Sequence, residues 1–301
     1  MVDGSNLLFQ MFYGMPARII NHEGRAIQGT LGFVGALLKM IRMVEPTHVA
    51  VFFDGECENE RRQIDGDYKA NRPDYSQMPE EDTPFSQMPD VYAALDWLGI
   101  AHKETTDCET DDWIAGYAWK LRQMSRVKWD ERQVEPDKSK FADESDSISE
   151  LIIASQDSDF FQLISDSTRI LRYRGDKTVI CDRNYIREKL GIEPEQYADF
   201  KSLTGDTADN IKGADKIGPK TAAALLAEYG NLENLIAGAE RIKKPSVRES
   251  VIRNADRLRK NYELIRLDRG MDSLPFMLEE MVYFDQGVGT TEVLKGIGVR
   301  R

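Results

Sequence analysis

The stretch from Thr204 to Leu226 combines acidic residues with a glycine-rich turn that carries lysines, and it reads TGDTADNIKGADKIGPKTAAALL. Asp206 and Asp209 are three positions apart, so they would share one face of a helix. The glycines at 213 and 218 and the proline at 219 would interrupt that helix before an apolar run begins another. The pattern predicts a helix, a hairpin and a second helix.

A hairpin built on Gly218 can bind a phosphate group. Its backbone N–H groups and the N-terminus of the next helix would face the phosphate, and Lys216 and Lys220 would add positive charge beside it. An ordinary helical turn with solvated lysines is the alternative, and this stretch alone leaves both interpretations open.

Seven more acidic residues stand where an α/β protein places a site. Four of them follow candidate strands, and parallel strands end at one edge of their sheet. Three lie in the first turn of a candidate helix that begins at the same edge. Any single one could merely cap a helix or complement a helix dipole, but seven together are stable at neutral pH only if cations neutralise them. They are Asp3, Asp54, Asp157 and Asp159 after the strands, and Glu109, Asp111 and Asp112 in the helix.

Oxygen ligands without nearby histidine or cysteine favour Mg²⁺ or Mn²⁺. The three histidines, His22, His48 and His102, are isolated in the sequence and are interpreted as structural or surface residues. The chemistry that suits such a cluster is metal-assisted phosphodiester hydrolysis, with two or more ions roughly 4 Å apart. Lys69 and Arg72, three apart on one predicted helical face, would stabilise charge on the reacting phosphate, with a solvated surface pair as the alternative.

The elements that would position these residues alternate between strands and helices, which predicts a mostly parallel sheet with helices on both faces. After residue 182 the pattern is mainly helical. Residues 71–89 contain too many prolines for a continuous helix and predict a crossing loop, and residues 125–150 predict a flexible, charged insertion. The candidate strands that follow the first one at Asp3 are residues 47–54, 99–103, 151–154, 169–173 and 178–181.

Composition limits the cellular setting and the partners. A chain of 301 residues with 41% hydrophobic content can bury a full core. Cys57, Cys108 and Cys181 are far apart, which argues against disulfides and zinc and fits a reducing cytoplasm. The sequence has no membrane span and no signal-peptide pattern, so no membrane partner is expected. The net charge of −12 opposes general nucleic-acid binding, but most of it would belong to the acidic cluster, and local basic patches remain.

Six segments together resemble the bacterial 5′ nucleases, which include flap endonucleases and the 5′-3′ exonuclease domain of DNA polymerase I. They appear in the family's order across roughly residues 1–267, and as a set they are highly specific. Only two residues precede Asp3, whereas members of that family usually begin several residues earlier, so a truncated or wrongly started first strand is expected. The segments are VDG at Asp3, VFFD at Asp54, YKANR at 68–72, ETDD at 109–112, QDSDFFQL at Asp157, and the stretch from Thr204 to Leu226.

The resemblance implies a fold and a division of the chain. The fold is a PIN-like 5′ nuclease core of mostly parallel sheet flanked by helices, with a helical arch and a C-terminal helix-hairpin-helix. Residues 1–181 would form the metal-binding core, with the arch at 59–89 and the insertion at 125–150. Residues 182–270 would form a helical region with the helix-hairpin-helix at 204–229, and residues 271–301 a tail without an assigned role.

The resemblance also implies roles for individual residues. Lys69 and Arg72 match the basic pair that contacts the reacting phosphate, and K⁺ would assist the hairpin in holding duplex DNA. The first metal would be held by Asp54, Glu109, Asp111 and Asp157, with Asp3 near it through water; the second by Asp159, Asp206 and Asp209, with Asp112 supporting both. The residues assigned to DNA binding are Lys212, Gly213, Lys216, Gly218, Lys220 and Thr221.

The sequence therefore predicts a structure-specific 5′ nuclease of replication and repair. It would hydrolyse DNA with a 5′ flap, a 5′ overhang or a nick by a two-metal mechanism, and it would act as a monomer. Two alternatives stay open: a DNA-junction binding module with weak catalysis, and a PIN-type ribonuclease, which shares the acidic sheet edge but usually lacks the hairpin.

Overall fold

The centre of the molecule is a six-stranded sheet with the strand order β3-β2-β1-β4-β5-β6. The computed structural model describes residues 1–55, 60–131, 149–267 and 273–299. Neighbouring strands run parallel except at one edge, where β6 pairs antiparallel with β5. The predicted fold class, a mostly parallel sheet flanked by helices, is confirmed. The strands are β1 (Val2–Asp3), β2 (Ala50–Phe53), β3 (Ala101–Glu104), β4 (Leu151–Ala154), β5 (Thr168–Arg172) and β6 (Val179–Cys181).

The central strands β2 and β4 are short and fully apolar because both of their faces are covered. All four residues of β2 are buried. Strand β1 has only two residues and pairs with β2 through Val2 and Asp3. The strand predicted at 47–54 is shorter in the structure, because the backbone before Ala50 pairs with the C-terminal part of the chain in a bridge between His48 and Val282.

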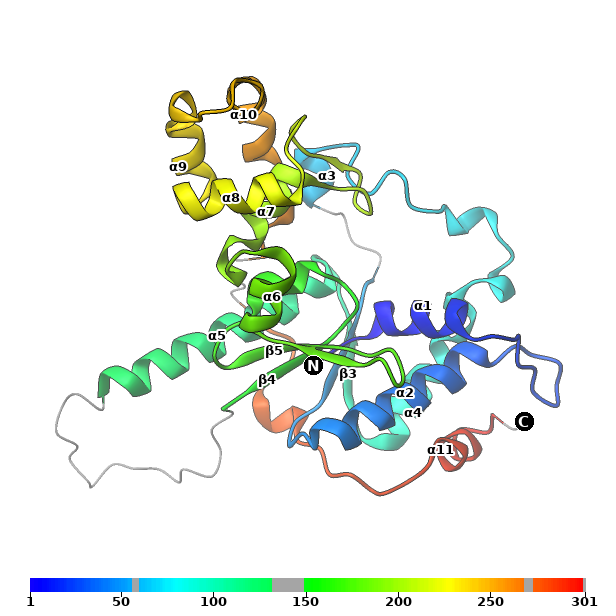
Figure 1. Cartoon of the computed structure of the whole chain (residues 1–301). Coiled ribbons are helices and arrows are strands. Elements are labelled where there is room, and N and C mark those ends of the chain that lie inside the picture. The colour runs from blue at the N-terminus through cyan, green and yellow to red at the C-terminus, as the bar shows by residue number, and fades with distance from the viewer. Residues whose placement is uncertain (56–59, 132–148, 268–272, 300–301) are drawn as a thin grey trace.

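Two helical layers cover the sheet, and alternate side chains of β2 point into different hydrophobic clusters. Val51 and Phe53 pack with α1, α2, α4 and α11, which lie together on one side in Figure 1. Ala50 and Phe52 pack with α5 on the opposite face. The helices are α1 (Gly4–Gly14), α2 (Gln28–Val44), α4 (Met88–Leu98), α5 (Thr110–Glu131) and α11 (Thr290–Gly296).

A mainly helical region follows the sheet, and all of its helices except the first stand at the top of Figure 1. A two-stranded hairpin, β7 with β8, interrupts it. A 3₁₀ helix, η5 (Asp159–Leu163), follows the short loop after β4. The elements of this region are α6 (Arg183–Leu190), α7 (Tyr197–Thr204), β7 (Gly205–Asp206), β8 (Ile211–Lys212), α8 (Pro219–Tyr229), α9 (Leu232–Ala237) and α10 (Pro245–Ile265).

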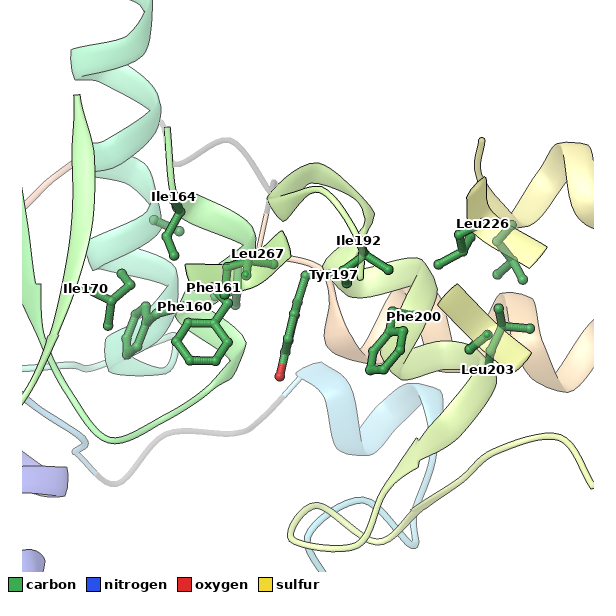
Figure 2. Packing of buried hydrophobic residues seen from close by; sticks show 14 of the residues in the cluster. Phe160, Phe161, Ile164, Ile170, Ile192, Tyr197, Phe200, Leu203, Leu226 and Leu267 are labelled. Carbon is green, nitrogen blue, oxygen red and sulfur yellow. The ribbon is translucent and has the colours of Figure 1, made fainter. Parts of the chain in front are cut away.

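One hydrophobic cluster continues from the sheet into the helical region. Figure 2 shows Phe160 and Phe161 beside the sheet, followed by Tyr197 and Phe200 towards the helices. The rings of Phe161 and Tyr197 meet edge to face, with centroids 5.6 Å apart. Shared burial therefore fixes the helical region relative to the edge of the sheet where η5 begins.

The segment predicted as a crossing loop is built from short turns. It follows α3 (Glu60–Ile64) and contains the 3₁₀ helices Tyr75–Gln77, Glu80–Asp82 and Pro84–Gln87. Helix α5 extends to Glu131 and so enters the insertion predicted at 125–150. Parts of several predicted segments lie outside the described residues, as does Cys57. They are residues 132–148 of the insertion, residue 59 of the arch, residues 268–270 of the helical region, and residues 271, 272, 300 and 301 of the tail. The predicted division into domains stays a prediction.

The C-terminal part of the chain packs along the sheet and its helices. The ring of Phe276 stacks on Phe52 at 6.0 Å, and the Tyr117 hydroxyl donates a hydrogen bond to the backbone oxygen of Phe276. Val293 of α11 is fully buried in the cluster with α2 and α4. These contacts reach both faces of the sheet. Among the described residues, no helix combines the length and the apolar composition needed to cross a membrane.

A buried carboxyl group in α7 predicts a pH-dependent stability. Asp199 is 7% exposed and accepts a hydrogen bond from the backbone N–H of Leu232 at 3.0 Å. Burial raises its pKa from 3.8 to about 6. A carboxyl group whose pKa is raised in the folded state favours folding below its unfolded pKa, and this contribution is lost as pH rises through the folded pKa.

We therefore expect Asp199→Asn to gain stability over the wild type as pH rises. The amide keeps the acceptor oxygen and does not ionise, so the difference should grow by about 1–2 kcal/mol between pH 5 and pH 7.5. Thermal unfolding at both pH values measures it. Asp256→Asn, at a fully exposed side chain, should show no such trend. A pH-independent difference for Asp199→Asn would contradict the prediction.

Candidate active site

The ends of β1 and β4 bring two of the predicted acids together. Asp3 caps α1 by accepting a hydrogen bond from the backbone N–H of Asn6 at 3.0 Å. The Ser155 hydroxyl donates to Asp3 Oδ2 at 2.8 Å and accepts from the backbone N–H of Asp157 at 3.0 Å. A single serine thus links the carboxylate after β1 with the loop after β4.

Asp54, after β2, attaches the start of α5 to the same edge. Its Oδ1 accepts a hydrogen bond from the backbone N–H of Thr110, the first residue of α5, at 2.9 Å. Glu109 lies directly before the helix, whereas Asp111 and Asp112 occupy its first turn. The capping contact therefore carries three carboxylates to the end of the sheet.

Asp206 and Asp209 come from a hairpin and not from a helix. The prediction that they share a helical face is wrong, because α7 ends at Thr204 and Asp206 belongs to β7. Gly205 has a φ of +81°, and a Cβ there would meet the backbone nitrogen of Gly213 at 2.5 Å. The two backbone segments pass close to each other at this point, as the strands of a hairpin do. Asp206 and Asp209 are therefore three positions apart because they lie in a tight turn.

Lys69 and Arg72 also lie outside a helix, so the prediction of one helical face is wrong for them. Helix α3 ends at Ile64, and Lys69 has a left-handed φ of 56°. The backbone N–H of Lys69 donates a hydrogen bond to the backbone oxygen of Asp209 at 3.0 Å, and this bond fixes the turn. Both side chains nevertheless reach the acids: Lys69 Nζ pairs with Glu109, and Arg72 with Asp209 at 2.8 Å.

Three residues of this site were not assigned from the sequence. Arg61 is almost fully buried and pairs with Glu109 and Asp112. Lys201 pairs with Asp206. The hydroxyl of Tyr68 lies 3.4 Å from both Glu109 Oε2 and Asp209 Oδ2 and so connects the α5 acids with the hairpin acids. The YKANR motif contains Tyr68, but no local pattern distinguishes Arg61 from its neighbour Arg62.

Burial and mutual repulsion shift the titration of the acids. Burial, followed by the charge of Asp54, raises the pKa of Asp3 to about 7. Burial raises the pKa of Asp157, and it holds the pKa values of Asp111 and Asp159 well above the usual range. For Glu109 burial acts in the same direction, but the charges of Lys69 and Arg61 outweigh it and lower the pKa. The cluster is therefore short of positive charge.

In this structure, ion pairs with basic side chains engage several carboxylates of the cluster. Within the described residues no three acidic, histidine or cysteine side chains converge as a ready-made metal site. Both oxygens of Glu109 are engaged, one by Lys69 and one by Arg61. Two buried oxygens, Asp111 Oδ1 and Asp159 Oδ1, accept no hydrogen bond, although Asp111 Oδ1 lies 3.6 Å from Arg61 in an ion pair. The cluster thus retains carboxylate oxygen without a hydrogen bond on the α5 side and on the η5 side.

The residues assigned to DNA binding lie on a separate rim formed by β8, the following loop and the start of α8. Ala214, Ile217 and Ala222 are buried and anchor this loop. The lysines between them point outward, and Gly218 precedes α8 with an extended backbone and open space at its Cβ position. Lys212, Lys216, Gly218 and Lys220 are exposed, and Gly213 and Thr221 are half-buried.

Two family models match the chain. One describes the N-terminal resolvase-like domain of 5′-3′ exonucleases and matches residues 1–130; the other describes the C-terminal SAM fold of 5′-3′ exonucleases and matches residues 192–286. The chain belongs to the 5′-3′ exonuclease family.

Relatives of this 5′-3′ exonuclease family member include a 5′-3′ exonuclease and DNA polymerases I. It is 28% identical to a 5′-3′ exonuclease of Aquifex aeolicus over 272 residues, which cover 90% of this chain and 82% of that protein. It is 34% identical to DNA polymerase I of Rhizobium leguminosarum over 275 residues, which cover 89% of this chain and 24% of that protein. The chain thus spans about a quarter of the length of this polymerase.

Solved structures share the fold. A bacteriophage T5 flap endonuclease in a complex with DNA and metal ions has a TM-score of 0.67 and 19% identity, covering 99% of this chain and 98% of that one. The catalytic core of Rad2 in complex with DNA substrate has a TM-score of 0.55 and 17% identity, covering 98% and 91%. At these identities the likeness concerns the fold.

The crossing of Gly205 and Gly213 gives a test of the hairpin in this 5′-3′ exonuclease family member. A Cβ at Gly213 would lie 2.3 Å from the carbonyl carbon of Thr204. Gly213→Ala should therefore destabilise the protein by roughly 1–3 kcal/mol, as overpacking does. Gly218→Ala, where the Cβ meets open space, should change stability by less than about 1 kcal/mol. Thermal unfolding of both variants measures the difference. Equal stability of Gly213→Ala and Gly218→Ala would show that the backbones of residues 205 and 213 do not approach this closely.

Proposed function

We propose that this protein is a divalent-metal-dependent 5′ nuclease that hydrolyses phosphodiester bonds in DNA with a 5′ flap, a 5′ overhang or a nick. The observation that carries the proposal is the cluster of carboxylates at the end of the sheet, beside Lys69 and Arg72. Membership of the 5′-3′ exonuclease family supports it, and so does the fold shared with a flap endonuclease solved with DNA and metal ions.

The residues present fit Mg²⁺ or Mn²⁺. The donor set consists of carboxylates, which these ions prefer, and the buried oxygens Asp111 Oδ1 and Asp159 Oδ1, which accept no hydrogen bond, are two candidate ligand atoms. When bound, such ions supply an activated water molecule and stabilise charge on the reacting phosphate. The proposed ligands of one ion are Asp54, Glu109, Asp111 and Asp157, with Asp3 through water; those of a second are Asp159, Asp206 and Asp209, with Asp112 supporting both.

Lys69 and Arg72 would exchange one partner for another. Both now neutralise acids of the cluster, Glu109 and Asp209. Metal ions held by those acids would leave the two side chains available for the phosphate, where their charge would stabilise the developing negative charge. The turn at Lys69 keeps this pair close to the carboxylates in either state.

The rim from Lys212 to Thr221 would bind the backbone of duplex DNA. Exposed lysines attract phosphates, and the open space at Gly218 allows backbone N–H groups to approach one. We further propose that K⁺ assists this contact and that the protein acts as a monomer in the cytoplasm, in DNA replication and repair. The distance between the rim and the carboxylates would then determine which phosphodiester bond is cut, independently of the base sequence.

The central test compares substrates, metal and variants. The wild type should cut a 5′-flap DNA with Mg²⁺ and not with EDTA, and Asp157→Ala with Asp159→Ala should reduce the rate by a factor on the order of 10³. Asp166→Ala, at an exposed side chain, is the control. Equal cleavage by wild type and double variant would overturn the proposal. Tight junction binding without any cleavage would favour a binding module, and preference for an RNA flap a ribonuclease.

The rim is tested by DNA affinity. Lys216→Ala and Lys220→Ala should each weaken binding of flap DNA in EDTA and reduce the slope of log Kd against log salt by about 1, because each removes one phosphate contact. Lys189→Ala, an exposed lysine on α6, should leave both quantities unchanged. Unchanged salt dependence in the two rim variants would exclude these lysines from the DNA contact.

A further inference from the structure

Arg61 connects three parts of the protein through one buried guanidinium group. Its side chain is 3% exposed. Its Nε donates to the backbone oxygen of Leu264 at 3.0 Å, and its terminal nitrogens donate to both oxygens of Asp112 at 2.8 and 3.1 Å. One of them also donates to Glu109 Oε2 at 2.5 Å. The contacts therefore join α3, the start of α5 and the last turn of α10.

Helix α10 reaches from the DNA-binding rim to the acidic cluster. In its second half, Arg257 donates to the backbone oxygen of Gly213 at 2.8 Å, and Asn261 donates to that of Lys212 at 3.0 Å. Its last turn presents carbonyl groups that the helix itself does not satisfy. Arg61 binds one of them, at Leu264.

A second side chain holds the same turn from the other side of the site. Gln162 of η5 donates to the backbone oxygen of Ile265 at 3.1 Å and accepts from the backbone N–H of Leu267 at 2.8 Å. The same amide group donates to the backbone oxygen of Asp159 at 2.9 Å. The end of α10 is thus fixed between the acids at the start of α5, through Arg61, and the backbone of Asp159 in η5, through Gln162.

We propose that Arg61 is a positioning residue that transmits the placement of α10 on DNA to Glu109 and, through the ion pair of Glu109, to Lys69. Asp112 serves this role by binding the guanidinium group with both of its oxygens. The inference rests on the proposed nuclease function, and it adds the route by which duplex binding at the rim is coupled to the acidic cluster.

An arginine is required for this geometry. Two parallel bonds to a carboxylate and a third to a carbonyl need the planar, forked guanidinium group, whereas a lysine supplies a single point of charge. A residue that only neutralised the acids would be replaceable by lysine. Arg61→Lys therefore separates positioning from neutralisation, and Arg62→Lys, at the exposed neighbouring position, is the matched control.

Arg61→Lys should lower the single-turnover cleavage rate of 5′-flap DNA by about tenfold or more, because small misplacement of reacting groups has large effects on rate. The Kd for the same DNA in EDTA should stay within about twofold, since the rim lysines are untouched. Arg62→Lys should change neither quantity. A wild-type rate for Arg61→Lys would overturn the proposal.

Backbone amide hydrogen exchange tests the contact between Arg61 and α10 without metal or DNA. In Arg61→Lys, backbone amides at residues 264–267 should exchange faster than in the wild type, while those of α8 and the β-sheet stay unchanged. Unchanged exchange at 264–267 would also overturn the proposal. If the wild type itself cut no DNA, the nuclease function would fail, whereas the exchange comparison would still report whether Arg61 holds α10.

A second variant keeps the proposal testable if Arg61→Lys does not fold. Arg61→Met combined with Asp112→Leu removes both charges of the pair, and such replacements often preserve stability. This variant should unfold near the wild-type temperature, and its backbone amides at residues 264–267 should exchange faster than those of the wild type, a readout that does not depend on the proposed role of Asp112 beside the metal ions. A wild-type rate in the folded double variant would show that the pair does not position the site.

Discussion

Crowding of carboxylates is the constraint on which the rest of this structure depends. Acids after β1, β2 and β4 meet those of α5 and of the β7–β8 hairpin, and burial raises the pKa values of several of them. Such a cluster is stable only beside positive charge. Arg61, Lys69, Arg72 and Lys201 provide it from segments distant in the sequence. The neutralising contacts therefore also assemble the site, and any metal ion would have to share or replace them.

Apolar packing and polar contacts have separate roles in holding the helical region. The cluster in Figure 2 fixes this region against the sheet through Phe161, Tyr197 and Phe200, but such packing is not directional. Hydrogen bonds from Arg61 and Gln162 to the last turn of α10 add direction. Both kinds of contact thus fix the distance between the rim and the carboxylates, on which the proposed choice of the cleavage site depends.

Much of the site could be predicted from the sequence because parallel strands end at one edge and because its motifs are specific. The errors arose where a local pattern fits two conformations. A spacing of three between Asp206 and Asp209 suits a helix, but the backbone contact of Gly205 with Gly213 forms a hairpin. Lys69 and Arg72 were placed on a helix for the same reason, whereas a bond to Asp209 holds Lys69 in a left-handed turn.

The sequence alone determined the α/β class, the mostly parallel sheet and the family, since apolar runs, their alternation with helices and the order of motifs are properties of the chain itself. It also indicated which acids and which lysines to consider. Only the tertiary structure decided how these charges pair. Arg61 and Arg62 are indistinguishable as neighbours in the sequence, and one is buried among Glu109, Asp112 and Leu264 while the other is exposed. Such selection depends on contacts between residues up to 203 positions apart, which no local pattern encodes.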